Sequence, residues 1–209
     1  AEYCVCTDCN YKVYNHTYLN NVASAGHGGG LWLNATAVGI AYVNISGSIF
    51  DANRAQENGG GLFLNTSETS VMALVSGNLF VRNRAKFGGG LNLLGTSQAQ
   101  FNVTSNTFSD NHVTLNGGGL LAGLTNCVLS SSFNLFANNS APVSSGGGDF
   151  QVVSNTSMAW LENTYQNNSA MDGGGQYVFA SANSSCVMAH TRFLENTASN
   201  NGGGQSILL

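Results

Sequence analysis

The chain has 209 residues, 43% of them apolar and only 8% charged, with a formal net charge of −4. Six lysines and arginines are too few for the basic surface of a nucleic-acid-binding protein, and no apolar run approaches the ~20 residues of a membrane-spanning helix. Asn and Gly, at 28 and 27 residues, favour turns and corners over helices. We expect no nucleic-acid partner, no direct membrane span, and a source of solubility other than charged side chains.

The first segment, AEYCVCTDCN, contains three cysteines, Cys4, Cys6 and Cys9. Their density favours a disulfide formed in an oxidising compartment over a metal site, because no fourth ligand follows at a zinc-like spacing. We expect residues 1–17 to form a Cys-rich cap or linker. The segment is not a signal peptide, and we interpret the chain as a mature or excised one without its leader.

From residue 18 onward, one motif recurs at a nearly constant period. A triple glycine begins at positions 28, 59, 88, 117, 146, 173 and 202, so the spacings are 27 to 31 residues. Eight to ten residues before each triple glycine, an aromatic residue begins the motif [FY]-x-x-N-x-[AV]. The motif starts with YLNNVA at Tyr18 and continues at Phe50, Phe80, Phe108, Phe136, Tyr165 and Phe193. Its asparagines include Asn53, Asn83, Asn111, Asn139, Asn168 and Asn196.

Between the glycine corners lie short runs with a period of two, such as LNLLGTSQAQFNVTSN, which predict strands. No run of a dozen residues has a helical stripe, and the repeat is too short for a propeller blade of ~40–45 residues. About 29 residues fit one turn of a parallel β-helix with three short strands and three corners. We predict an all-β fold in which residues 18–209 form a right-handed parallel β-helix, a solenoid of about seven coils.

Successive coils of a solenoid lie about 4.8 Å apart, so equivalent side chains stack. We expect the aromatic residues from Phe50 to Phe193 to form a column that fills the interior. The motif asparagines should occupy a corner, because Asn tolerates the left-handed conformation and its amide can bond to the amides above and below. The triple glycine marks a second corner, where the missing Cβ atoms permit positive φ and close backbone stacking.

The alternation of FxxN with a glycine corner followed by an aliphatic residue resembles the FxxN and GG[AG]-[ILV] repeats of the chlamydial polymorphic outer-membrane proteins. The resemblance covers roughly residues 18–209 and implies a right-handed β-helical passenger domain on a cell surface. Two features differ from that family. The third position of the triplet is Gly in every copy, where the family usually has Ala. The residue after the triplet is polar in the last three copies, which have Asp149, Gln176 and Gln205. No autotransporter barrel is visible in the sequence.

Sequons for N-glycosylation are the main candidate modification sites. Nine N-x-[ST] sequons occur, at Asn15, Asn34, Asn44, Asn65, Asn102, Asn138, Asn155, Asn167 and Asn183. Asn34 and Asn65 share one position of the repeat, and Asn138 and Asn167 share another. We expect stacked glycans in rows along one face, which would supply the hydrophilic coat that charged residues do not. The alternative is that these are ordinary Asn-rich turns.

The position after GGGL carries Trp32, Phe63 and Leu121. If Leu31 and Leu33 point inward, Trp32 points outward, and an exposed aromatic row could stack on glycans or on a neighbouring chain. The alternative is a reversed strand phase in which these residues belong to the core, and the late segments DFQVV and QYVFA fit that alternative better.

The remaining cysteines, Cys127 and Cys186, lie two coils apart, which corresponds to about 10 Å and exceeds the reach of a disulfide. We expect two buried thiols.

Charged and ionisable residues are few. Asp149 and Asp172 flank adjacent glycine corners but lack a basic partner, and we assign them no catalytic role. His16, His27, His112 and His190 sit at different repeat positions and predict no metal site or triad. Arg54 and Arg84 share a repeat position, near Arg82 and Lys86, and a solvated face balanced by Asp51 and Glu57 is favoured over a binding patch.

The sequence therefore predicts a secreted or cell-surface structural glycoprotein without cofactor or enzymatic activity. Its partners would be copies of itself and its covalent N-glycans, in a filament or coat made by end-to-end or lateral stacking. End-to-end stacking is suggested by NGGGQSILL, which begins another coil without a cap, so that either the chain continues or the open edge meets another molecule. The alternatives are an adhesin passenger domain that binds host cells or glycans and, less favoured, a polysaccharide lyase or hydrolase.

Overall fold

The computed structural model describes residues 1–36, 40–67 and 70–209. In these ranges the chain forms strands and turns without any helix, and every strand pair is parallel. The strands belong to four sheets, here called sheets A to D. The protein is therefore an all-β parallel solenoid of about seven coils, as the repeat predicts.

Each coil contributes one strand to each sheet, in the order A, B, C, D. Sheet A consists of β1 (Glu2–Thr7), β5 (Leu31–Thr36), β9 (Leu62–Ser67), β13 (Leu91–Gly95), β17 (Leu120–Thr125), β21 (Asp149–Ser154), β25 (Gln176–Ser181) and β29 (Gln205–Leu208). Sheet B consists of β2 (Asn10–Tyr14), β6 (Ile40–Ser46), β10 (Ser70–Ser76), β14 (Gln100–Thr104), β18 (Val128–Ser132), β22 (Ser157–Leu161) and β26 (Ser185–Ala189). Sheet C consists of β3 (Thr17–Leu19), β7 (Ile49–Asp51), β11 (Leu79–Val81), β15 (Thr107–Ser109), β19 (Leu135–Ala137), β23 (Thr164–Gln166) and β27 (Arg192–Leu194). Sheet D consists of β4 (Val22–Ala23), β8 (Arg54–Ala55), β12 (Arg84–Ala85), β16 (His112–Val113), β20 (Ser140–Ser145), β24 (Ser169–Asp172) and β28 (Thr197–Asn201).

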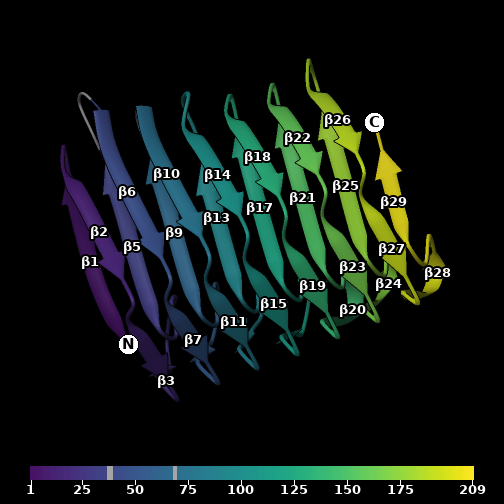
Figure 1. The fold of residues 1–209 in the computed structure, drawn as a ribbon, viewed down its shortest axis with the longest axis horizontal. Coiled ribbons are helices and arrows are strands. Elements are labelled where there is room, and N and C mark those ends of the chain that lie inside the picture. Colours follow the sequence, from purple (N-terminus) through teal and green to yellow (C-terminus); the bar gives the residue numbers. More distant parts are fainter. Residues whose placement is uncertain (37–39, 68–69) are drawn as a thin grey trace.

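The coils lie side by side along the long axis, from the purple N-terminal coil to the yellow C-terminal one (Figure 1). The expectation of three strands per coil is wrong, because the segment between the aromatic residue and the glycines forms two short strands, in sheets C and D, with a corner between them. Residues 1–17, expected to be a cap or linker, supply β1 and β2, which pair in register with β5 and β6. The solenoid thus begins before the first aromatic motif.

The aromatic residues of the motif form one column inside the solenoid. The rings from Tyr18 to Phe193 stack nearly parallel, with centroids 4.7–4.9 Å apart. Phe50, Phe80 and Phe108 have no exposed surface. The leucines and valines of sheets A and B pack around this column and complete the core.

The motif asparagines form a second buried column, at the corner between sheets C and D. The side chain of Asn83 donates from Nδ2 to the carbonyl oxygen of Phe50 at 2.8 Å and to Oδ1 of Asn111 at 3.1 Å, while its backbone N–H donates to the same Oδ1 at 3.0 Å. The amide of Asn83 thus bonds a strand carbonyl of the preceding coil, and its Oδ1 accepts the backbone N–H of Asn53, which lies at the corner outside the strands. The left-handed conformation expected of these asparagines falls instead on the residue before each of them, such as Ala52 and Arg82, which both have φ of 54°.

A second asparagine column lies at the corner between sheets B and C, and sequence analysis missed it. Asn78, Asn106, Asn134 and Asn163 repeat the same pattern of amide bonds, with Nδ2–Oδ1 distances of 3.0–3.1 Å. The signal was present, because each of these residues precedes a motif aromatic by two positions.

The glycine corner permits the close approach of successive coils. The first glycine of each triplet has positive φ, for example 63° at Gly59. A Cβ atom on Gly60 would lie 2.4 Å from the carbonyl oxygen of Gly89 in the next coil. At the third position, a Cβ atom on Gly90 would lie 3.0 Å from a ring atom of Phe108. The glycine corner therefore packs directly against the aromatic column, which links the two halves of the motif.

We predict that Asn111→Ala lowers the free energy of unfolding by about 3 kcal/mol or more. The substitution leaves the buried N–H of Asn83 without its Oδ1 acceptor and removes the amide donors to the carbonyl of Phe80 and to Oδ1 of Asn139; a buried group left unsatisfied costs about 1–3 kcal/mol. Urea unfolding of chain produced without glycosylation measures the effect. Asn102→Ala, an exposed Asn on sheet B, is the matched control, and equal midpoints for the two variants would contradict a stabilising role of the column.

Candidate functional site

The interior of the solenoid changes character in the last three coils. The inward position of sheet A that holds Leu62, Leu91 and Leu120 holds Asp149 and Gln176 in the next two coils. Both polar side chains are fully buried. Oδ2 of Asp149 accepts hydrogen bonds from Nε2 of Gln151 at 2.8 Å, from Nε2 of Gln176 at 3.1 Å and from the hydroxyl of Tyr165 at 3.2 Å. A closed polar cluster thus replaces part of the apolar core inside sheet A.

Burial raises the pKa of Asp149 to about 6, against the smaller, opposing effect of its three hydrogen-bond donors. The same burial, together with the neighbouring carboxylate, raises the pKa of Tyr165. Oδ1 of Asp149 and Oε1 of Gln151 are buried without a hydrogen-bond partner. The carboxyl group is therefore held in an environment that favours its neutral form.

Asp149 and Asp172 do not form a carboxylate pair. Asp149 is enclosed in the interior, where a substrate has no access, whereas Asp172 is half-exposed at the end of β24. Oδ1 of Asp172 accepts from the backbone N–H of Asn201 at 3.1 Å and from the side chains of Asn200 and Asn201. The two residues thus have different, structural surroundings.

The histidines lie far apart in the fold. His16 bonds to the carbonyl of Tyr14 at 2.8 Å, His27 bonds to Nδ2 of Asn58 at 2.9 Å, His112 lies on sheet D, and His190 lies exposed at a corner. Over residues 1–36, 40–67 and 70–209, no group of three His, Cys, Asp or Glu side chains is arranged to hold a metal ion. The part of the chain that the structure describes also contains no helix that could cross a membrane.

The residues after the glycine corner form an outer row on sheet A. Leu31 and Leu33 point inward and Trp32 outward, and the same phase continues to the late coils, where Phe150 and Tyr177 stack outside at 5.3 Å. The reversed phase suggested by DFQVV and QYVFA is therefore wrong. The full row is Tyr3, Trp32, Phe63, Asn92, Leu121, Phe150, Tyr177 and Ser206.

This row is not an exposed aromatic platform. The ring of His27 covers it, with centroids 5.1 Å from Trp32 and 4.9 Å from Phe63. Phe63, Leu121 and Phe150 are less than 10% exposed, because the glycine corners lie against them. From Phe63 to Phe150 the row is therefore a thin outer layer of the core, whereas Tyr3 at its start is 58% exposed.

The sequon asparagines are distributed over several sides of the solenoid. Asn34 and Asn65 lie on the outer face of sheet A and are linked by a hydrogen bond of 3.0 Å. Asn44 and Asn102 lie on sheet B, in one column separated by Leu74. The others lie at corners: Asn15, Asn138, Asn155, Asn167 and Asn183. Asn34, Asn44 and Asn65 are half-buried and the remaining six are exposed. The expected stacking of Asn34 on Asn65 is confirmed, but the nine sequons do not form rows along one face.

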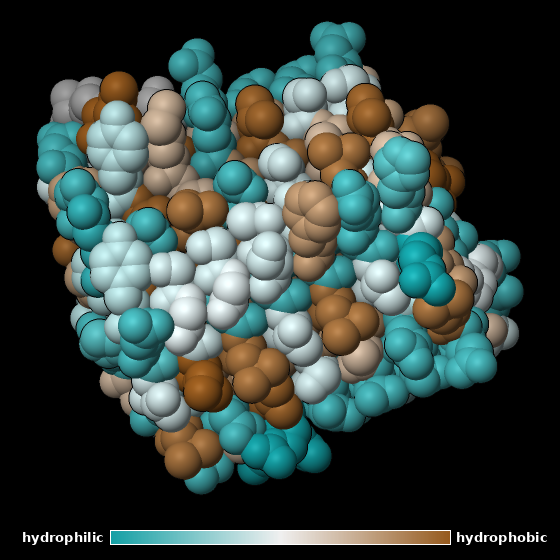
Figure 2. Space-filling model, viewed as in Figure 1, coloured by the Kyte–Doolittle hydropathy of each residue, from teal (hydrophilic) through white to brown (hydrophobic). Residues whose placement is uncertain are grey.

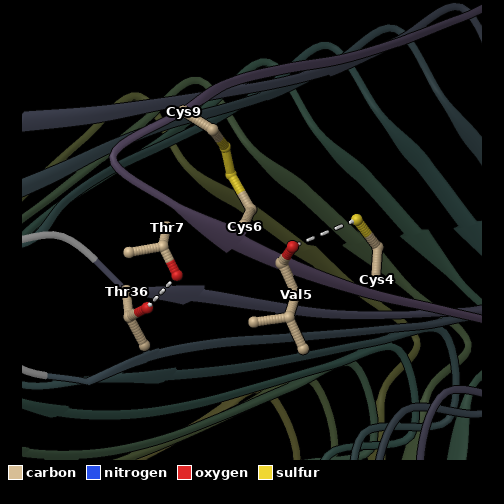
Figure 3. Close-up of a disulfide and its surroundings, with 6 residues drawn as sticks. All are labelled: Cys4, Val5, Cys6, Thr7, Cys9 and Thr36. Atoms are coloured by element: carbon tan, nitrogen blue, oxygen red, sulfur yellow. Dashed lines mark hydrogen bonds between the residues drawn. A yellow bond between two sulfur atoms is a disulfide. The ribbon is translucent and has the colours of Figure 1, made fainter.

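The N-terminal cysteines are partly paired. Cys6 and Cys9 form a disulfide across the turn between β1 and β2, with Cα atoms 5.6 Å apart, while Cys4 is a free thiol (Figure 3). Cys127 is also free and buried, as expected, and burial raises the pKa of its thiol. Cys186 is exposed, so its assignment as a buried thiol was wrong. It lies in β26, the last described strand of sheet B, and is covered from one side only.

A groove of about 580 Å³ crosses the outer face of sheet B. Its walls include the exposed rings of Tyr14 and Tyr42, and Lys12 lies beside them. On its floor, Nδ2 of Asn44 donates to the hydroxyl of Tyr14 at 3.2 Å. The other lining residues are Asn10, Val43, Met72, Ala73, Leu74, Gln100, Phe101, Asn102, Val128 and Ser130. Exposed aromatic rings beside several amides are suited to an uncharged polar ligand such as a sugar.

The expected balance of the local cations by Asp51 and Glu57 is confirmed for two of the four, Arg82 and Lys86. Nε of Arg82 donates to Oδ1 of Asp51 at 3.0 Å, and Nζ of Lys86 lies 3.3 Å from Oε2 of Glu57. Asp51 raises the pKa of Arg82 through this hydrogen bond and its charge. In the view of Figure 2, hydrophobic side chains are scattered among hydrophilic ones and form no single continuous patch.

No family model, no curated protein and no solved structure matches this chain. The resemblance to the chlamydial polymorphic outer-membrane proteins therefore stays a hypothesis that rests on the repeat motif.

We predict that ionisation of Asp149 destabilises the folded chain. Its folded-state pKa of about 6 lies above the ordinary value of 3.8, so the stability present at low pH is lost as the pH rises from 4 through 6. Relative to wild type, Asp149→Asn should gain about 2 kcal/mol of unfolding free energy between pH 4 and pH 7. Urea unfolding at both pH values measures this gain. The same difference between variant and wild type at both pH values would show that Asp149 does not titrate in this range.

Proposed function

We propose that the chain is a rod-shaped structural unit of an extracellular filament or coat, in which copies of the chain stack end to end or side by side. The observation that carries the proposal is the continuity of the ladders: aromatic rings 4.7–4.9 Å apart and asparagine amides bonded from coil to coil run through the described coils. A fold stabilised in this way is rigid along its axis, which suits a load-bearing or coat-forming element.

The hydrogen bonds and stacking contacts between coils can also form between coils of separate chains. Each coil binds its neighbour through backbone ladders and side-chain columns, so a coil of a second copy can make the same bonds. A side-by-side contact has a candidate surface too. One row on the outer face of sheet C contains three exposed aliphatic side chains, Ile49, Leu79 and Leu135, with Thr107 between the last two.

N-glycosylation and an extracellular location belong to the same proposal. The Cys6–Cys9 pair is typical of an oxidising compartment, and six sequon asparagines are accessible. Glycans there would cover a surface with very few charges. They would also explain how a rod with 8% charged residues stays soluble.

The second candidate is a surface adhesin that binds glycans, as the resemblance to passenger domains implies. The groove on sheet B, with Tyr14 and Tyr42, favours it. Because Asn44 and Asn102 line this groove, glycans attached to them would fill it, so adhesion here and glycosylation at these two residues exclude each other. A lyase or hydrolase ranks third. Glycoside hydrolysis needs two accessible acidic groups within ~10 Å, and Asp149, one of the two candidate carboxylates, is buried.

Assembly is tested by sedimentation over a range of concentrations and by electron microscopy of the purified glycosylated chain. We expect the mass to increase with concentration and the particles to be elongated and periodic. Leu79→Lys should abolish side-by-side association through sheet C and leave end-to-end growth intact, while Val128→Lys on sheet B is the matched control. A monodisperse monomer at high concentration would rule out self-assembly.

Glycosylation is tested by expression in a eukaryotic secretory system, enzymatic removal of N-glycans and mass spectrometry of the peptides. We expect high occupancy at the exposed corner residues Asn138 and Asn167 and lower occupancy at Asn34 and Asn65, whose amides are half-buried and bonded to each other. Unmodified asparagine at all nine sequons would contradict the glycoprotein proposal.

A further inference from the structure

The outer face of sheet D carries a second groove, of about 440 Å³, over the first four coils. One wall is the row Val22, Arg54, Arg84 and His112, whose members are paired in register across β4, β8, β12 and β16. The opposite wall contains Ser24, Gln56, Lys86 and Thr114, and alanines line the floor between the walls. With coils about 4.8 Å apart, the groove runs about 14 Å along the rod axis.

Among the residues that the structure describes, Arg54 and Arg84 have no carboxylate partner. They occupy equivalent positions in adjacent coils and are both exposed. Within the described ranges, neither makes an ion pair or a side-chain hydrogen bond, whereas nearby Arg82 is bonded to Asp51 and Lys86 to Glu57. Like charges directly opposite each other on neighbouring strands destabilise a sheet. The two guanidinium groups are therefore cations without compensation in a chain whose net charge is −4.

A bound anion would remove this repulsion. Guanidinium groups bind carboxylate, sulfate and phosphate oxygens with paired N–H donors, which makes arginine the preferred side chain for such ligands. His112 continues the row, with its pKa lowered by burial and by Arg84, and can donate a hydrogen bond as a neutral ring. On the opposite wall, the amide of Gln56 and the hydroxyls of Ser24 and Thr114 can bind uncharged hydroxyl groups.

We propose that this groove binds an acidic oligosaccharide, with its sulfate or carboxylate groups against Arg54 and Arg84 and its hydroxyl groups against the opposite wall. The length of the groove suits a chain of sugars rather than a single ion. No Phe, Tyr or Trp lines it, so it lacks the rings on which nucleic-acid bases stack. None of its lining residues is a sequon asparagine, so the groove stays free of the chain's own glycans. The site is independent of self-assembly.

The experiment is isothermal titration of the monomeric, unglycosylated chain. The probes are a heparin-derived hexasaccharide for sulfate, an oligogalacturonate for carboxylate, a neutral maltohexaose, inorganic sulfate and a single-stranded oligonucleotide. We expect one or both acidic saccharides to bind, more weakly as salt is added. The double variant R54Q/R84Q should reduce their affinity about tenfold or more, and R82Q, whose side chain lies outside the groove, should change it less than twofold.

Thermal unfolding checks the variants independently. Because Arg54 and Arg84 are exposed, R54Q/R84Q should fold and should no longer be stabilised by the acidic saccharide that stabilises wild type. Undiminished binding by the double variant, equal affinity for maltohexaose, or equal affinity for inorganic sulfate would each overturn the proposal. Tighter binding of the oligonucleotide than of both acidic saccharides would overturn it too and would indicate a phosphate-binding site.

Discussion

The structure depends on one interaction, the hydrogen bond from the amide of an asparagine to the equivalent amide in the next coil. A solenoid must turn several corners in every coil, and each corner takes backbone N–H and C=O groups out of the sheets. The side chain of Asn83 supplies hydrogen-bond partners at such a corner. Its Oδ1 accepts the backbone N–H of Asn53, and its Nδ2 donates to the carbonyl of Phe50 in the preceding coil and to the amide of Asn111 in the following one. The aromatic column fills the space inside this corner, and the glycines let the coil close against it. Corner, core and glycine turn are thus one packing unit, which is why they recur together in the sequence.

Because this unit fixes the interior, the differences between coils are confined to the outward positions and to a few inward ones. At one inward position, the column of leucines continues as Asp149 and Gln176. A buried carboxyl group is tolerated there because three hydrogen-bond donors surround it. Outward positions are free to vary, and they carry the chain's individual features: the tyrosine-lined groove on sheet B, the unpaired arginines on sheet D and the sequons. A function other than that of a rod must therefore be sought on the surface rather than in the interior.

The sequence was sufficient to predict a parallel solenoid, because the repeat is long, regular and tied to glycine. Only glycine fits at these corners, since a Cβ atom on Gly60, for example, would lie 2.4 Å from a carbonyl oxygen of the next coil. Phe80 lies in the aromatic column and Asn83 in the asparagine column, as the motif predicts. The number of strands per coil was missed, since a strand of two residues such as β8 has no periodicity to detect. The phase of the late coils was also uncertain, because a polar residue at Asp149 argues for the surface until its partners are known. The balance of Arg82 and Lys86 by Asp51 and Glu57 was predicted, but the absence of such a partner at Arg54 and Arg84 within the described residues depends on side-chain directions that a motif does not specify.

The asparagine columns also have a direction. In each pair, the backbone N–H and one side-chain N–H of an earlier residue, such as Asn53, point to Oδ1 of the later one, Asn83, and never the reverse. The amide-to-amide bonds therefore all point the same way along the axis, so that within each column a coil offers N–H donors to the following coil and an Oδ1 acceptor to the preceding asparagine. Copies that continue the column must all run the same way, so a thread made of them would be vectorial, with two ends that elongate at different rates.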